Sequence, residues 1–384
     1  MSNKTRVAII GVVGVPARYG GLETLAHHFV LNLANRYDLT VYNTKTMYEP
    51  HERPDTWEGA KVKYIPFKAN GAQSVIYDII AMLWAVWSHD VLVVLGVSGG
   101  LIMPFIKWFF PSKKLIVNID GLEWRRPKWG KFAKSYLKFA EKLANRYADR
   151  IVADNKGIQD YVTEIYGRES DMIAYGGDHA RSAEILAEDR EAYSFLAGRY
   201  AVKACRIEPE NNIEMILEGF SRFEDISLVI LGNWNDSAFG RSMRQKYSKY
   251  AHIHMLDFIR DMRVLDMLRA NSYVYLHGHS AGGTNPSLVE AMNLGLPIIS
   301  FDVIFNRETT ESKAIFFDSA DKLLAELRQL TPESRAATGE SMREVAQRRY
   351  TWKVISEQYA TSIEKSLQAK PSLSGDNLET QSAI

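Results

Sequence analysis

The segment His277–Glu290 combines residue types that could bind a phosphate group. Glycines follow an apolar run, and Asn285 and Pro286 then suit the start of a helix, because Asn caps helices and Pro fits the first helical position. Free amides around Gly283, together with the positive end of the helix, would attract phosphate oxygens. Glu290, one turn into the helix, could reach the ribose of a bound nucleotide. A capped helix with a solvated Glu explains the same pattern, so both interpretations stand at this level.

A second glycine-rich turn, Gly11–Gly21, precedes the helical pattern Leu22–Asn35. Gly20 and Gly21, ahead of a helix that bears Glu23, could let the backbone approach a diphosphate or a sugar. The spacing G-x-G-x-x-G is absent, so the dinucleotide fingerprint is matched only loosely. A flexible strand-to-helix loop is the alternative.

Histidines cluster in three places along the chain. The close pairs are His27-His28, His252-x-His254 and His277-x-His279. A His-x-His pair on a strand points both rings to one face and could bind a metal. No carboxylate or cysteine stands at a typical companion spacing, so we expect no metal site. His277 or His279 is expected either to border the phosphate pocket or to serve the structure.

The segment Trp124–Lys138 is strongly basic and aromatic. The residues expected to face an acceptor or a membrane are Trp124, Arg125, Arg126, Lys128, Trp129 and Lys131. Such residues suit the headgroup layer of an anionic membrane, and the cations could also hold the diphosphate of a lipid-linked acceptor. Ser74–Trp87 and Ile106–Phe110 add further aromatic candidates. A solvated helix face is the alternative, and single-stranded nucleic acid is disfavoured because no binding motif accompanies the pattern.

The elements that must position these residues follow from the apolar pattern. Short β-branched runs alternate with amphipathic stretches, which predicts βαβ units and a mainly parallel sheet. The predicted strands are Val7–Ile10, Leu39–Tyr42, Val62–Ile65, Val91–Leu95, Leu115–Ile119, Arg150–Ala153, Tyr200–Ala204, Ser227–Leu231, Ile253–Leu256, Ser272–Leu276 and Pro297–Ser300. The predicted helices are Leu22–Asn35, Ser74–Trp87, Lys131–Tyr147, Asn211–Phe220, Arg260–Ala270, Pro286–Asn293, Asp321–Leu330 and about Trp352–Leu367.

The pattern pauses at Tyr175–Asp178, which divides the strands into two series. We therefore expect an α/β protein of two Rossmann-like doubly wound domains that face a cleft, with ligands beyond the carboxyl ends of the strands. The first domain would cover 1–175 and be completed by a helix within 350–367 that crosses back. The second would cover 176–349, and 368–384 would be a mobile tail.

Composition is that of a globular protein. The 384 residues favour two domains, and 47 Lys and Arg against 46 Asp and Glu leave no overall charge to attract nucleic acid. Cys205 is the only cysteine, which excludes an intrachain disulfide and fits a reducing compartment. The first apolar run is too short for a signal peptide or a membrane span. We expect a cytoplasmic protein, peripheral at the inner face of the plasma membrane.

Four segments in this order give the sequence a family resemblance. They are Gly14–Glu23, Asn118–Arg126, Arg206–Asn212 and His277–Met292. The sequence resembles glycosyltransferase family 4, which has the GT-B fold, and within it the rhamnosyltransferase-like subgroup of polysaccharide-assembly enzymes. The likeness covers nearly the whole chain except the tail.

The resemblance implies site residues position by position. Glu290 matches the second Glu of a Glu-x7-Glu motif, whose first Glu falls at Gly282. Arg206 matches an Arg that grips the donor diphosphate, whereas Asn211 stands where a Lys is expected, and Asp120 stands where many members have His. Catalytic roles are implied for Asp120, Glu290 and Arg206. Donor binding is implied for Gly20, Gly21, Arg206, Asn211, His279, Gly282, Gly283, Thr284, Asn285 and Glu290.

The implied activity is transfer of a hexose or deoxyhexose, with rhamnose from dTDP-rhamnose as the subgroup suggests. Transfer would retain the anomeric configuration and need no metal or other cofactor, the donor being a dTDP- or UDP-linked substrate. The acceptor would be a polyprenyl-diphosphate-linked oligosaccharide of a surface polysaccharide. Two alternatives remain: a dinucleotide-dependent oxidoreductase, and a catalytically inactive nucleotide-sugar-binding protein.

Overall fold

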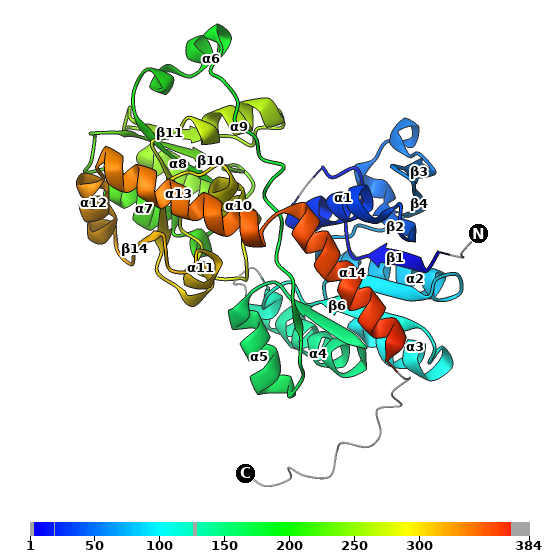
Figure 1. The fold of residues 1–384 in the computed structure, drawn as a ribbon. Coiled ribbons are helices and arrows are strands. Elements are labelled where there is room, and N and C mark those ends of the chain that lie inside the picture. Colours follow the sequence, from blue (N-terminus) through cyan, green and yellow to red (C-terminus); the bar gives the residue numbers. More distant parts are fainter. Residues whose placement is uncertain (1–3, 19, 126–128, 370–384) are drawn as a thin grey trace. The chain divides into compact units, whose positions relative to one another are not determined.

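The computed structural model describes residues 4–18, 20–125 and 129–369, which form two compact units (Figure 1). Unit 1 comprises the chain up to Ala174 and again from Ile355, and unit 2 comprises Tyr175–Val354. From residue 370 onward, the predicted tail lies outside the described residues.

Unit 1 is built on a sheet with the strand order β3-β4-β2-β1-β5-β6-β7-β8. Neighbouring strands are parallel, apart from the antiparallel pair β3 and β4. The strands are β1 (Arg6–Ile10), β2 (Asp38–Thr44), β3 (Thr56–Trp57), β4 (Ala60–Ile65), β5 (Val91–Leu95), β6 (Lys114–Asn118), β7 (Arg150–Ala153) and β8 (Asp171–Met172). Every residue of β5 and β6 is buried, as in parallel sheets covered on both faces.

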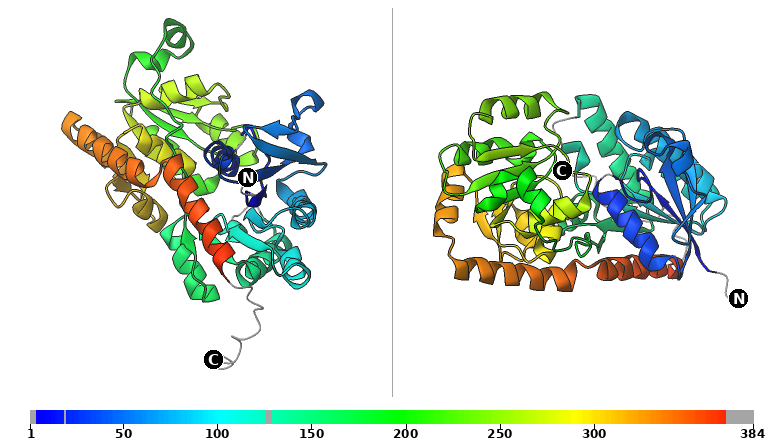
Figure 2. Two further views of the ribbon diagram at one scale, coloured as in Figure 1. Left: turned by 45° about the vertical axis from the view of Figure 1, so that its right-hand side comes forward. Right: turned by 90° about the horizontal axis from the view of Figure 1, so that it is seen from above.

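Helices cover both faces of this sheet (Figures 1 and 2). They are α1 (Gly21–Leu33), α2 (Ser74–Val86), α3 (Met103–Phe109), α4 (Lys131–Tyr147) and α5 (Lys156–Tyr166), joined by most of α14 (Trp352–Gln368). On α1 the buried side chains include Leu25, Phe29 and Leu33, which are four residues apart and so share one face.

Unit 2 is built on a parallel sheet with the order β11-β10-β9-β12-β13-β14. Its strands are β9 (Tyr200–Ala204), β10 (Ser227–Leu231), β11 (Ile253–Leu256), β12 (Val274–His277), β13 (Ile298–Phe301) and β14 (Ile315–Phe317). Its helices are α6 (Ala187–Ala192), α7 (Ile213–Phe220), α8 (Ala238–Tyr247), α9 (Met262–Ala270), α10 (Pro286–Asn293), α11 (Ile304–Thr309), α12 (Ala320–Gln329) and α13 (Pro332–Arg349). Phe220, Leu228, Trp234, Leu276 and Leu323 lie in its fully buried core.

The strand order reverses direction once in each unit. The chain moves outward from β1 to β2 and β4, and then returns to place β5 on the other side of β1; β9 and β12 repeat this arrangement in unit 2. At such a switch point the loops after the two central strands diverge, which leaves room for a ligand at the carboxyl edge. The edges after β1 and β5, and after β9 and β12, are therefore the places to look for a site.

Helix α14 returns to unit 1 and packs beside α1 (Figure 2). The Tyr359 hydroxyl accepts a hydrogen bond of 2.9 Å from Asn118 Nδ2 at the end of β6, and its ring meets Phe29 of α1 edge-on at 5.5 Å. Ser362 donates to Asp171 of β8 at 2.7 Å. The predicted doubly wound α/β architecture, including the returning helix, is confirmed.

Some elements escaped the sequence analysis. Strands β3 and β8 have only two residues each, too few to show alternation. Helix α13 is long, but its buried positions are confined to Gly339, Met342, Val345 and Ala346, so it shows almost no apolar stripe. The sequence nevertheless marks the start of α13, because Thr331 and Ser334 form a capping box on either side of Pro332, the first helical residue.

Within the described residues, every helix is too short or too polar to span a bilayer.

Replacement of Tyr359 by Ala should lower the free energy of unfolding by about 3–5 kcal/mol, because it removes a fully buried aromatic ring and leaves a cavity. Urea unfolding followed by circular dichroism measures this change. Gln358→Ala, an exposed neighbour on the same helix, is the control and should leave the midpoint unchanged. Equal midpoints for the two variants would contradict the packing of α14 on unit 1.

Candidate functional site

The turn between β12 and α10 has the cap predicted for it. Asn285 Oδ1 accepts hydrogen bonds from the Ser287 amide at 3.1 Å and from the Ser287 hydroxyl at 2.8 Å, and Pro286 is the first helical residue. Gly282 has φ +107°, and a Cβ there would meet nothing within 4 Å. Glycine is needed at this position for its backbone conformation rather than for space.

The predicted donor-binding residues of this turn lie together. Thr284 is buried, whereas Gly282 and Gly283 are partly exposed and follow His279 in the turn. Within the first turn of α10, the Ser287 amide donates to Asn285 Oδ1 and the Leu288 amide donates to the Asn285 carbonyl at 3.0 Å. The turn can therefore present the positive end of the helix dipole, and the backbone that precedes Asn285, to an anion.

The loop after β9 is tied to this turn across the switch point. Asn212 Nδ2 donates to the Gly278 carbonyl at 2.8 Å, and the Ser280 amide and hydroxyl each donate to the Glu210 carbonyl at 2.9 Å. These bonds bring the two segments predicted from the sequence, Arg206–Asn212 and His277–Glu290, to one edge of unit 2.

Arg206 and Asn211 have different environments on this loop. The Arg206 side chain is exposed, and its backbone carbonyl accepts a hydrogen bond of 2.6 Å from Asn211 Nδ2. Asn211 is 2% exposed, so its side chain serves the loop rather than the solvent. Arg206 is thus an exposed cation on the loop at this edge.

Glu290 is held by a buried cation that the sequence analysis missed. Its carboxylate is paired with Arg269 of α9, and Arg269 also pairs with Asp266 at 3.1 Å. The Arg269 side chain is 1% exposed and that of Glu290 is 14% exposed. The interpretation of Glu290 as a solvated surface residue is therefore wrong.

His179 fixes the second oxygen of Glu290. Trp352 Nε1 donates to His179 Nδ1 at 2.9 Å, and because an indole N–H can only donate, Nδ1 must be the accepting nitrogen. His179 Nε2 then carries the proton and donates to Glu290 at 3.2 Å. Burial raises the pKa of Glu290, but the charge of Arg269 and the hydrogen bond from His179 lower it by more than burial raises it. The resulting pKa is about 2. Glu290 is an oriented anion at neutral pH.

In unit 1, the second glycine turn is anchored by Glu23. Gly20 caps α1 with φ 86°, a conformation that favours glycine, and Gly21 is the first helical residue. The Val13 amide donates to Glu23 Oε1 at 2.9 Å, and a Cβ on Gly20 would lie 2.7 Å from Glu23 Oε2. The Glu23 carboxyl therefore fixes both ends of the turn, with little room for a side chain at Gly20.

Asp120 lies close to Glu23 at the same edge. It follows β6 with φ 46°, and its amide donates to Asn118 Oδ1 at 2.9 Å. Burial raises the pKa of Glu23 to about 7, the Val13 hydrogen bond opposes this rise, and the charge of Asp120 adds to it. Two acidic side chains thus share the carboxyl edge of unit 1.

The basic and aromatic segment is partly described. Trp124 lies between two cations, with the Arg125 guanidinium 5.2 Å and the Lys138 ammonium 5.0 Å from its ring. Trp129 Nε1 donates to Glu123 at 3.0 Å, and Lys131 begins α4 with an exposed side chain. Arg126 and Lys128 lie outside the described residues.

In the turn between β12 and α10, His277–Asn285, which we call the phosphate turn after the ligand predicted for it, the two histidines stack on each other. The rings of His277 and His279 are 4.4 Å apart and nearly parallel, and His277 is fully buried. Among residues 4–18, 20–125 and 129–369, no group of three or more His, Cys, Asp or Glu is arranged to hold a metal ion.

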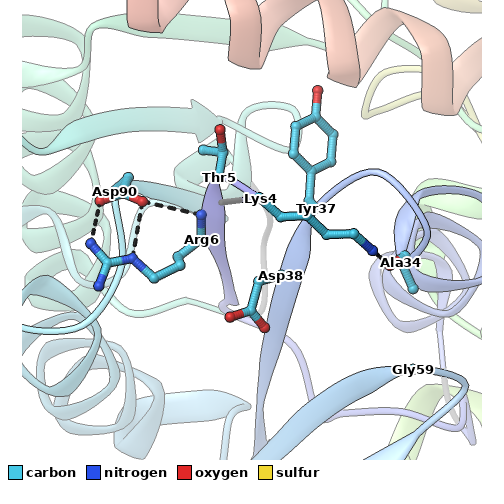
Figure 3. Close-up of a pocket in the computed structure, with 8 residues that line it drawn as sticks. All are labelled: Lys4, Thr5, Arg6, Ala34, Tyr37, Asp38, Gly59 and Asp90. Atoms are coloured by element: carbon cyan, nitrogen blue, oxygen red, sulfur yellow. Dashed lines mark hydrogen bonds and ion pairs between the residues drawn. The ribbon is translucent and has the colours of Figure 1, made fainter. Parts of the chain in front are cut away.

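A hollow of about 690 Å³ lies elsewhere in unit 1, at the start of β1 and β2 (Figure 3). Its charged side chains neutralise each other, since Arg6 pairs with Asp90 at 2.6 Å. It lies at the amino ends of the strands, away from the edge where open α/β sheets bind ligands. None of the predicted site residues lines it.

Two family models match the chain, one for each unit. Residues 4–178 match a domain of unknown function named DUF1972, and residues 188–348 match the model described as glycosyl transferases group 1.

Curated relatives match parts of the chain. An uncharacterized glycosyltransferase of Methanocaldococcus jannaschii is 23% identical over 209 residues, which cover 51% of this chain and 52% of that protein. The GtfA subunit of a UDP-N-acetylglucosamine–peptide N-acetylglucosaminyltransferase of Streptococcus parasanguinis is 27% identical over 128 residues, which cover 32% of this chain and 23% of that protein. The alignments thus span about half or less of the length of these relatives.

Solved structures match nearly the whole chain. A sucrose-phosphate synthase of Thermosynechococcus elongatus has a TM-score of 0.78 at 15% identity and covers 94% of this chain and 99% of that one. HepE of Anabaena in complex with UDP-glucose has a TM-score of 0.72 at 13% identity and covers 94% and 99%. At these identities the likeness shows the fold.

The fold places the chain in a class of two-domain α/β proteins with the GT-B architecture. More particularly, residues 188–348 match the model of group 1 glycosyl transferases, and the preceding part of the chain matches the DUF1972 model. The site residues implied by the resemblance remain predictions, including Asp120, Arg206 and Glu290.

The protonation of Glu23 predicts how stability changes with pH. Because its pKa rises from 4.5 to about 7 on folding, its favourable contribution is complete below pH 4.5 and is lost as the pH rises through 7. The loss is on the order of 3 kcal/mol. In the Glu23→Gln variant, the urea-unfolding midpoint should depend less on pH between pH 5 and 8 than in the wild type. The dependence that remains is the part contributed by Asp78, whose pKa is also about 7.

The exposed Glu164→Gln on α5 is the matched control and should reproduce the wild-type profile. A Glu23→Gln protein with the wild-type pH slope would show that this carboxyl is ionised throughout.

Proposed function

We propose that the protein transfers a sugar from a nucleotide-sugar donor to an acceptor. The observation that carries this proposal is the glycine-rich turn before α10, which lies at the switch point of unit 2 and is tied to the loop that bears the exposed cation Arg206. The match of the same residues to the group 1 glycosyltransferase model supports it.

The chemistry of sugar transfer requires what this edge offers. Cleavage of the sugar–phosphate bond leaves negative charge on the departing diphosphate and positive charge at the anomeric carbon. Preorganised donors for such developing charge contribute about 3 kcal/mol each. The amides around Gly283 and Thr284 and the guanidinium of Arg206 are proposed to stabilise the diphosphate. The family resemblance supports retention of configuration without a metal.

Glu290 is proposed to bind the ribose. Arg269 and His179 hold its carboxylate in one orientation and keep it ionised. An ionised carboxylate has about four lone-pair positions, so two remain for ribose hydroxyls. In unit 1, Asp120 is proposed to accept a hydrogen bond from a sugar or to stabilise the cationic centre.

The donor and acceptor are proposed from the subgroup resemblance. A hexose or deoxyhexose would be transferred, with dTDP-rhamnose as the first donor to test, to a polyprenyl-diphosphate-linked oligosaccharide. The UDP and UDP-glucose complexes of Anabaena HepE make uridine donors the second set.

Exposed aromatic side chains in unit 1 support the proposal of a lipid-linked acceptor. We call it the aromatic face; its exposed residues are Phe105, Trp108 and Phe109 of α3 and Phe132 and Phe139 of α4. Lys131, Lys138 and Lys142 are exposed on the same helix as the last two. Aromatic rings flanked by cations suit the headgroup layer of an anionic membrane. We propose that this face lies on the inner surface of the plasma membrane.

A panel of nucleoside diphosphates, their sugars and NAD tests the proposal by thermal stabilisation without added metal. A ligand at about 100 times its Kd stabilises a protein by about 2.7 kcal/mol. We expect selective stabilisation by dTDP or UDP compounds, and release of the diphosphate when acceptor is added. Stabilisation by NAD alone would favour an oxidoreductase, and donor binding without transfer or hydrolysis would favour an inactive binding protein.

Arg206→Ala should lower kcat/KM for the donor about 10- to 100-fold, because a hydrogen bond to a charged group contributes about 1.5–3 kcal/mol. The fold should be unaffected, since the side chain is exposed. Arg328→Ala, another exposed arginine of unit 2, should keep wild-type kinetics. Arg206 is a cleaner probe than Glu290, whose removal would leave buried Arg269 with Asp266 alone. Unchanged donor kinetics in Arg206→Ala would exclude this edge as the diphosphate site.

The double variant Trp108→Ser with Phe109→Ser should lose most binding to vesicles of phosphatidylglycerol and phosphatidylcholine. The two rings are 65% and 72% exposed, so the fold should survive. Co-sedimentation measures the bound fraction. Phe258→Ser, which removes a ring that is 54% exposed in unit 2, should bind as wild type. Equal sedimentation of the two variants would refute the aromatic face.

A further inference from the structure

Strand β9 contains a lysine that is entirely buried. Lys203 is 0% exposed, and among the described residues no oxygen or nitrogen atom forms a hydrogen bond with its Nζ, which has only the Cys205 thiol as a weak partner. An ammonium group is almost never buried without a partner, because loss of hydration costs several kcal/mol. A group of this kind in a native fold calls for an explanation.

The ammonium of Lys203 lies at the beginning of the phosphate turn. A Cβ on Gly278 would lie 3.1 Å from Lys203 Nζ and 2.4 Å from the Asn211 carbonyl. Lys203 and Asn211 therefore approach the same peptide from the β9 side of the switch point. A residue larger than glycine at position 278 would displace the Asn211 carbonyl or the Lys203 ammonium.

Other buried polar atoms at this point also lack partners. They are Asn211 Oδ1 and both ring nitrogens of His277, and both residues are at most 2% exposed. The described residues thus leave a cation, an amide oxygen and an imidazole unsatisfied beneath a turn that presents amides to an anion. No carboxylate of the described residues pairs with Lys203.

We propose that Lys203 is a buried counter-charge for the donor diphosphate, acting beneath the turn that binds it. This inference rests on the proposed function, because it assigns the diphosphate to the edge after β9 and β12. Without ligand, no carboxylate of the described residues compensates a charge on Lys203. When the diphosphate binds to the turn, its negative charge lies close to this ammonium in a region of low dielectric, where attraction is strong.

The neighbouring titratable groups leave Lys203 as the cation of this cluster. Burial lowers the pKa of His277 well below its usual value and nearby Lys203 lowers it further, so the imidazole is neutral. Burial lowers the pKa of Lys203, opposed by the Cys205 thiol, whose own pKa burial raises. The remaining charged neighbour, Arg206, is exposed at the same edge. A bound diphosphate raises the pKa of Lys203. Binding therefore takes up a proton at pH values between the pKa of Lys203 in the free protein and its higher pKa in the complex, and takes up none at lower pH.

The test compares stability and binding in Lys203→Met, which keeps the length of the side chain without its charge. A merely structural lysine predicts that this variant loses stability. A counter-charge predicts the opposite: the ligand-free variant is as stable as wild type or more so, because an unpaired buried charge has been removed. Its affinity for UDP or dTDP falls at least tenfold. Titration calorimetry on the full chain, in buffers of different ionisation enthalpy, measures affinity and proton uptake together.

A second variant provides rescue. Asn211→Lys in the Lys203→Met background restores an ammonium beside the same turn and should recover affinity. Lys249→Met, which removes an exposed lysine of unit 2, should leave affinity and stability unchanged. If Lys203→Met does not fold, Lys203→Gln replaces it in both measurements.

The outcomes separate this inference from the proposed function. A wild-type protein that binds no nucleoside diphosphate overturns the proposed function itself. A wild-type protein that binds, with a folded Lys203→Met variant of equal affinity, overturns only the role of Lys203. If the double variant binds the nucleoside diphosphate as weakly as Lys203→Met alone, an ammonium at position 211 does not replace the one at position 203, and the role of Lys203 as a general counter-charge is overturned.

Discussion

The guanidinium of Arg269 is buried between Asp266 and Glu290, and it determines the orientation of the Glu290 carboxylate on α10. Removal of one partner from such a buried pair costs about 3–5 kcal/mol, so neither side chain can turn away. The same carboxylate receives the Nε2 proton of His179, whose other nitrogen is held by Trp352 at the start of α14. One network therefore joins α9, α10, the segment that begins unit 2 and the helix that ends it. The orientation of Glu290 is a property of the whole of unit 2 rather than of its own helix.

The strand order gives these local contacts their functional meaning. Because β9 and β12 are neighbours in a parallel sheet, the loops after them begin at the same carboxyl edge. The contacts of Asn212 with Gly278 and of Ser280 with Glu210 tie the two loops together. Arg206, Lys203 and the amides before α10 are thereby concentrated at one point, although they come from segments about 80 residues apart in the chain.

Sequence reasoning succeeded where the signal is local. The cap of α10 depends on Asn285, Pro286 and Ser287, which are consecutive, and the strands of both sheets are short apolar runs. It failed where a partner is distant. Arg269 reads as an exposed residue on a polar helix, and nothing in the sequence relates it or His179 to Glu290. The burial of Lys203 did leave a signal, since it interrupts the otherwise apolar strand Tyr200–Ala204. A charge at a position that the strand pattern buries needs a partner: Lys114 of β6 has Asp149, whereas for Lys203 the proposed partner is the bound diphosphate.

Charge distinguishes the two candidate edges and assigns a ligand to each. The edge of unit 2 carries Arg206 and Lys203, neither of which is paired with a carboxylate in the described residues, together with the amides of the turn. The edge of unit 1 carries Glu23 and Asp120, which raise rather than lower the cost of bringing in an anion. Charge thus favours the edge of unit 2 over that of unit 1 for the proposed diphosphate site. Hydroxyl groups, by contrast, donate hydrogen bonds to carboxylates at little electrostatic cost. A sugar is the kind of ligand that the acidic edge can bind, and a nucleotide is the kind that the basic edge can bind.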